Sequence, residues 1–202
     1  MMVFSTYFWN GFQHALVGGG FALLFYRFNK TNDFKRWEYL SGLIMSSSAL
    51  FFLPAHIGNY RSFIDRLYQF LHYPLADWDI LLFSIDWHRF FVTHSLIIPV
   101  IVLVAFLHKP IGYRLGLGLC IGHSSHLVWD AITCSMYTPI VFLNDVIEIR
   151  GYWAKGWLIL NGTILFGFAW FVTQKIQHTE NFDRGGTAHN AHNMKDFSLL
   201  YN

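Results

Sequence analysis

The segment GHSSHLVWDAIT, which ends at Thr133, has the clearest potential for chemistry in the chain. On a helix, His126 and Asp130 stand one turn apart, and His123 precedes His126 by three positions, so all three side chains share a face. An imidazole and a carboxylate on one face can bind one cation, as zinc and similar metals prefer. A structural hydrogen-bonded pair is the alternative, because paired polar groups also satisfy each other in lipid.

A second group of chemically capable residues lies in DWDILLFSIDWHRFFVTHS, which spans 77–95. Asp77 and Asp79 could bind a metal, although aspartate is also a common residue at helix starts. His88, Arg89 and His94 follow. Arg89 could hold an anionic group with two hydrogen bonds, or could anchor the chain at lipid phosphates. The sequence leaves both interpretations open.

A third candidate, His14, lies in FQHALVGGG near the N-terminus. A single histidine near the end of a membrane span can simply reach towards the interface. The glycines that follow, Gly18, Gly19 and Gly20, would let another helix approach closely. Such packing would bring His14 towards the other candidate ligands.

The composition indicates the surroundings in which these residues work. The chain has 202 residues, of which 54% are hydrophobic, 19% aromatic and 13% charged, which is far more apolar than an average soluble domain. The formal net charge of +2 and the scattered Lys and Arg residues exclude a nucleic-acid-binding protein. Cys120 and Cys134 lack the spacing of a metal or redox motif, so we interpret them as unpaired thiols.

Long apolar stretches predict an all-α fold, a polytopic transmembrane helical bundle, because a membrane helix needs about 20 mostly apolar residues. A mixed polar and aromatic stretch at 61–79 predicts a short helix at the membrane interface. The predicted domains are a membrane-embedded helical domain at 1–175 and a mobile, polar cytoplasmic tail at 176–202. The five predicted spans are 7–28, 39–57, 91–108, 112–133 and 153–173.

The basic residues predict how this bundle is oriented. One side would receive Arg27, Lys30, Lys35, Arg36, Lys109, Arg114, Lys175, Arg184 and Lys195. The other would receive only Arg61, Arg66, Arg89, Arg150 and Lys155. We therefore expect an integral multi-pass protein of a bacterial inner membrane, with its N-terminus outside and its C-terminus in the cytoplasm. The candidate His and Asp residues then all fall at the outward face.

Taken in order, these segments resemble the YdjM-like family of predicted membrane-bound metal-dependent hydrolases. The resemblance runs from His14 to about Thr133. The matching elements are Gln13-His14 with Gly18 and Gly19, Asp77-Trp78-Asp79, the run from His88 to Ser95, and the run from Ser125 to Thr133. Ala76, Phe90 and Gln13 depart from the family's usual proline, glycine and threonine. The order of ligand types is also similar to that of zinc-dependent phospholipases C and related nucleases.

We therefore hypothesise that one or two divalent metal ions, zinc or alternatively manganese, bind to His14, Asp79, His94, His126 and Asp130. Asp77, His88 and Arg89 are the candidate catalytic residues. Asp77 would accept a proton from water that the metal makes more acidic, and Arg89 would stabilise the substrate's negative charge. A site at headgroup depth suggests a lipid or other phosphoester substrate within the bilayer.

Two other classes of protein fit the same residues. A transporter would pass a cation along its intramembrane His and Asp side chains. The inner halves of the predicted spans, such as IIPVIVLVAFLH, are almost purely apolar and disfavour a continuous pathway. A structural membrane protein would instead use the same residues as hydrogen-bonded His-Asp pairs. The sequence does not decide the oligomeric state.

Overall fold

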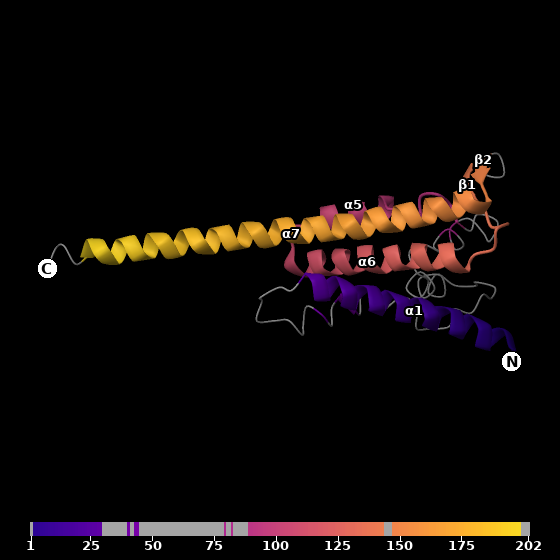
Figure 1. The fold of residues 1–202 in the computed structure, drawn as a ribbon, viewed down its shortest axis with the longest axis horizontal. Coiled ribbons are helices and arrows are strands. Elements are labelled where there is room, and N and C mark those ends of the chain that lie inside the picture. Colours follow the sequence, from indigo (N-terminus) through magenta and orange to yellow (C-terminus); the bar gives the residue numbers. More distant parts are fainter. Residues whose placement is uncertain are drawn as a thin grey trace.

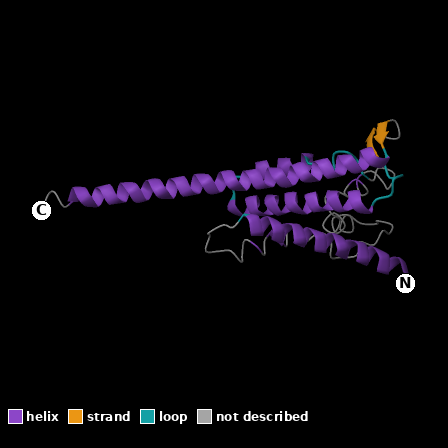
Figure 2. Ribbon diagram, viewed as in Figure 1, coloured by secondary structure: helices purple, strands orange, loops and turns teal. Residues whose placement is uncertain are grey.

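A computed structural model of the chain describes residues 2–29, 40, 43–44, 79, 82, 89–143 and 147–198. These residues are mostly helical, which confirms the predicted fold class at that level, with one small hairpin at one end (Figure 2). Most of the predicted span at 39–57 and of the interfacial helix at 61–79 lies outside the described residues. The described elements are α1 (Met2–Phe28), α5 (Ile97–Ala105), α6 (Pro110–Thr133), β1 (Ile140–Leu143), β2 (Ile147–Ile149) and α7 (Gly151–Ser198).

Helix α6 is central among the described elements, because it contacts α1, α5 and α7. Figure 1 shows α1, α6 and α7 lying lengthwise beside one another. The helix begins at Pro110, whose ring suits the first helical turn, and ends where Cys134 adopts an extended conformation. It starts two residues before the predicted span at 112–133 and ends at the same residue.

A close contact joins α6 to α7 at Gly162. The Ser124 hydroxyl donates a hydrogen bond to the Gly162 carbonyl at 2.6 Å. A Cβ atom at Gly162 would lie 3.0 Å from the Ser124 carbonyl oxygen and 3.0 Å from Cγ2 of Val128. Glycine is therefore required here for the two backbones to approach. Beside this contact, the buried apolar core includes Ala22, Phe25, Leu103, Leu117, Cys120, Ile121, Leu165 and Ala169.

The segment before α5 is not helical, although the sequence predicts a span at 91–108. The helix occupies only Ile97–Ala105, and residues 91–96 form turns and bends. Here the Ser95 hydroxyl donates to the Val92 carbonyl at 3.1 Å and accepts from the Ile97 amide at 3.3 Å. Such side-chain bonds compete with the helical hydrogen bonds of the backbone. They leave residues 89–96 as an irregular segment that faces the interior of the bundle.

Helix α7 is longer than the sequence predicts. The predicted span at 153–173 lies within it, but the helix runs for 48 residues to Ser198. Residues 176–198 are therefore helical, and the mobility that we expected of this tail stays a prediction. Residues 175–198 contain no proline, so no residue there breaks the backbone hydrogen-bond pattern. Figure 1 shows this half of α7 extending beyond the other helices.

The described helices differ in their capacity to cross a membrane. Within the described residues, one stretch, Gly151–Ile176, is long and apolar enough to do so. Helix α5 is too short, with nine residues, and α6 carries a polar run from His123 to His126. The predicted five spans are therefore not supported by length and composition.

Polar side chains share the interior with the apolar core, and many apolar side chains are exposed on the described helices. Buried polar residues include His14, Asn29, Arg89, His94, His123, Ser124, His126, Asp130 and Asn161. Exposed apolar residues include Leu16, Leu23, Leu24, Ile101, Val104, Ile111, Leu115, Ile159, Leu160, Ile164 and Phe171.

The contact at Gly162 predicts a position-specific effect on stability. We expect Gly162→Ala to lower the free energy of unfolding by about 1 to 3 kcal/mol, because the added methyl group overpacks the α6–α7 contact. Gly167→Ala is the matched control, since a Cβ atom there meets nothing within 4 Å. Thermal unfolding in detergent should give a lower Tm for the first variant only. Equal Tm values would contradict the packing described here.

Candidate metal centre

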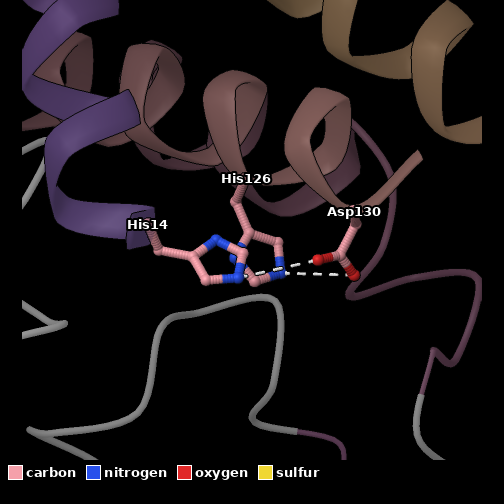
Figure 3. A group of neighbouring side chains, drawn as sticks. All are labelled: His14, His126 and Asp130. Atoms are coloured by element: carbon pink, nitrogen blue, oxygen red, sulfur yellow. Dashed lines mark ion pairs between the residues drawn. The ribbon is translucent and has the colours of Figure 1, made fainter. Parts of the chain in front are cut away.

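Two helices bring together three side chains that could hold a metal ion. His14 comes from α1, and His126 and Asp130 come from successive turns of α6, with all three side chains pointing to one place (Figure 3). One ligand atom from each lies within 4.8 Å of the others. The Asp130 carboxylate is 3.8 Å from Nε2 of His14, through Oδ1, and 3.8 Å from Nε2 of His126, through Oδ2. All three residues are buried.

The two histidines also contact each other directly. The rings of His14 and His126 stack with their centroids 4.5 Å apart and an interplanar angle of 25°. This contact positions α1 against α6 near the site. The sequence suggested that the glycines after His14 let another helix approach closely. At Gly19 and Gly20 no such close approach occurs, because a Cβ atom at either position meets nothing within 4 Å.

The irregular segment before α5 supplies a cation and a third histidine. Nη2 of Arg89 lies 3.1 Å from Oδ2 of Asp130. Nε2 of His94 lies 3.9 Å from the same oxygen. Both side chains are buried. The structure thus brings five of the predicted site residues close together: His14, Arg89, His94, His126 and Asp130.

Asp79 lies on the far side of His94 from Asp130. Its Oδ2 atom is 3.3 Å from Nδ1 of His94, and it accepts hydrogen bonds from the Phe90 amide and the Thr93 hydroxyl, each at 2.8 Å. A carboxylate at Nδ1 directs Nε2 of the same ring towards the site, as carboxylates do for metal-binding histidines. The geometry therefore favours Asp79 as a residue that orients His94, although the sequence suggested a direct ligand. Thr93 lies in the matched run from His88 to Ser95, but the sequence suggested no role for it.

Arg89 reaches the site from an unusual backbone conformation. Its φ of 72° lies in the left-handed region, which costs a residue with a side chain about 1 to 2 kcal/mol. Two hydrogen bonds hold the backbone there: the Val141 amide donates to the Arg89 carbonyl at 3.0 Å, and the Phe91 amide donates to the Val141 carbonyl at 2.9 Å. The hairpin thus fixes the position of the guanidinium group. Uncommon backbone conformations of this kind cluster at functional sites.

The distances around Asp130 distinguish two interpretations of the His-Asp pairs. A structural hydrogen bond between an imidazole and a carboxylate would bring their atoms to about 2.7 to 3.2 Å. The His14, His94 and His126 nitrogens instead lie 3.8 to 3.9 Å from the Asp130 oxygens. Ligands of one tetrahedral zinc ion lie roughly 3.3 Å apart, so small side-chain shifts would accommodate a cation among them. The spacing therefore leaves room for a shared cation.

The chemistry of the donor atoms also suits a cation. Nitrogen and oxygen donors in this combination suit zinc, and manganese is the alternative.

The remaining candidate residues are His123, Asp77 and His88. His123 is buried on the same side of α6, as predicted, with its ring centroid 6.4 Å from that of His126, but it does not belong to the set of three ligands. Asp77 and His88 lie outside the described residues. Their assigned roles therefore remain predictions from the sequence.

Comparisons with protein-family models, with curated proteins and with solved structures find no match to this chain. The resemblance to the YdjM-like family thus stays a prediction from its motifs.

The conformation of Arg89 predicts an unusual order of stability between two variants. Both Arg89→Gly and Arg89→Ala remove the ion pair with Asp130, but only glycine adopts a φ of 72° without strain. We expect the glycine variant to be more stable by about 1 kcal/mol. At Arg114 on α6, alanine should be more stable than glycine by about 1 kcal/mol, since helices favour alanine. Unfolding midpoints of the four variants would test this, and the same order at both positions would contradict it.

Proposed function

We propose that the chain is a membrane-bound metal-dependent hydrolase. The observation that carries this proposal is the convergence of His14, His126 and Asp130, three buried ligands whose donor atoms lie within 4.8 Å of one another. The donor set suits zinc, or alternatively manganese. The resemblance of the same residues to the motifs of the YdjM-like family supports the proposal.

The surrounding residues have complementary roles in this proposal. His94 is a further ligand, and Asp79 holds its ring through Nδ1. A divalent cation at this place would make a water molecule acidic enough to supply hydroxide near neutral pH. Asp77 and His88, from the sequence, are candidates to accept and return the proton. Arg89, whose guanidinium adjoins Asp130, would balance the negative charge that develops on the substrate.

We propose further that the protein is a multi-pass bundle in a bacterial inner membrane, with an outward N-terminus and a cytoplasmic C-terminus. Its many exposed apolar side chains and its buried polar cluster support a membrane setting. Tyr137, Tyr152 and Trp153 are each more than 80% exposed, close to the junction where α6 ends and α7 begins. Exposed Tyr and Trp are typical of the membrane-water interface. Asp130 is less than one turn from the end of α6, so the site lies at headgroup depth in this proposal.

A site at headgroup depth favours a phosphoester substrate that is either linked to a lipid or small enough to reach the membrane interface. Such a substrate presents its phosphate at the same depth as the ligands. The reaction would be hydrolysis of a phosphoester bond by water.

The proposed orientation predicts on which side of the membrane the C-terminus lies. We expect a fluorescent protein fused after residue 202 to fold and fluoresce, because it stays in the cytoplasm. Alkaline phosphatase at the same place should be inactive, since it requires the oxidising outward side. The reverse pattern would exclude the proposed topology.

The metal proposal predicts different effects for ligands and for the orienting carboxylate. Purified wild-type protein should hold zinc in stoichiometric amount after loading, and His14→Ala, His126→Ala and Asp130→Ala should each lose it. Asp79→Asn should keep the stoichiometry but bind zinc about 10- to 100-fold more weakly, because the His94 ring loses its orientation. Elemental analysis and competition with a chelator measure these two quantities.

Two variants outside the site serve as controls for the metal experiment. His108→Ala removes an exposed histidine beyond α5, and Glu148→Gln removes a carboxylate that pairs with Arg150 in the hairpin. Both should bind zinc like the wild type. A folded wild-type protein that binds neither zinc nor manganese would overturn the hydrolase proposal and favour a structural role for the His and Asp residues.

A further inference from the structure

Arg89 has more hydrogen-bonding capacity than the described residues use. Its side chain is buried, and Nη2 faces Asp130 at 3.1 Å. Nε and Nη1 are also buried, and neither has a hydrogen-bond partner in the described part of the chain. Together these two nitrogens carry three N–H donors. Buried donors of a charged group are normally satisfied, so three such donors at one site indicate a ligand that accepts them.

The backbone around Arg89 is held in place, so the side chain cannot move away to find partners for Nε and Nη1. Its left-handed conformation is held by the hydrogen bonds on either side to Val141, and the next amide, of Phe90, donates to Asp79. The same Asp79 orients His94. The segment that places a ligand histidine therefore also places the guanidinium, at a fixed position relative to Asp130.

We propose that the guanidinium group of Arg89 forms a subsite for a phosphate oxyanion, and that this subsite and the metal position both adjoin Asp130. The inference rests on the proposed function and assigns the group that holds the phosphate of its substrate. Asp130 accepts one of the two N–H donors of Nη2, so the second can act together with the unpartnered Nε or Nη1 as a fork for two oxygens of a phosphate group. Oδ2 of Asp130 is approached by Arg89 and by His94 and His126, so an oxyanion on Arg89 would lie next to the cation.

The metal ion and the phosphate would both lie beside the Asp130 carboxylate, so the binding of one affects the binding of the other. A cation attracts an adjacent anion, so phosphate binds more tightly when the metal is present. By thermodynamic linkage, phosphate strengthens metal binding by the same factor. Arg89 itself repels a neighbouring cation, and a bound phosphate offsets that repulsion. The coupling should therefore depend on Arg89.

The test is calorimetric titration of inorganic phosphate into the full-length protein in detergent, with and without one equivalent of zinc and with excess zinc removed. Wild-type protein should bind phosphate at least about tenfold more tightly with zinc than without it. Arg89→Gln should weaken binding to the zinc form about tenfold or more while keeping its zinc stoichiometry, and Arg89→Lys should be intermediate because lysine lacks the planar fork. Arg150→Gln, at an exposed arginine in the hairpin region, should match the wild type.

The possible failures are distinguishable from one another. Equal phosphate affinity in the wild type and in zinc-loaded Arg89→Gln would overturn the subsite. Acetate that competes with phosphate at equal concentration would overturn the assignment to phosphate in favour of a carboxylate. A wild-type protein that binds no metal would overturn the proposed function, whereas the metal-free titrations of the wild type and Arg89→Gln would still test the anion subsite directly.

Discussion

The burial of the Asp130 carboxylate is the constraint on which the described structure depends. A carboxylate inside an apolar bundle is stable only when other groups compensate its charge. Four side chains gather round it, from α1, from α6 itself and from the segment before α5: His14, Arg89, His94 and His126. Three separate parts of the chain are therefore positioned with reference to one functional group. The polar α6 face, the break before α5 and the hairpin that holds Arg89 all serve that arrangement.

Much of this site could be predicted from the sequence because helical spacing is regular. The i and i+4 positions of His126 and Asp130 give their shared face, and α6 keeps nearly the predicted bounds because Pro110 starts it and no later proline interrupts it. The participation of His14, Arg89 and His94 was predicted from the motifs rather than from spacing. Geometry then separates their roles. Asp79, which the sequence suggested as a metal ligand, contacts Nδ1 of His94 through its Oδ2 atom. The sequence does not contain the position of that oxygen.

The rest depends on contacts that a linear pattern does not contain. The conformation of Arg89 follows from hydrogen bonds to Val141, whose distance along the chain leaves no local signal. The shortness of α5 reflects competition by the Ser95 hydroxyl for backbone groups, in a segment whose apolar composition predicts a longer helix. The close approach of α6 and α7 occurs at Gly162, whereas the more conspicuous run of glycines in α1 has open space at Gly19 and Gly20. The polar residues after 175 predicted a tail, yet α7 continues through them.

The link between Val141 and the Arg89 segment has a consequence for the order of folding. Arg89 precedes α6 in the chain, but its backbone is fixed by a strand that is synthesised after α6. His14 likewise precedes its partner Asp130 by most of the described chain. Contacts between distant parts of a chain form late, because closing long loops costs entropy before any contact repays it. His14 and Asp130 are more than twice as far apart in the sequence as Arg89 and Val141, so by this argument the hairpin docks first and the docking of α1 completes the site.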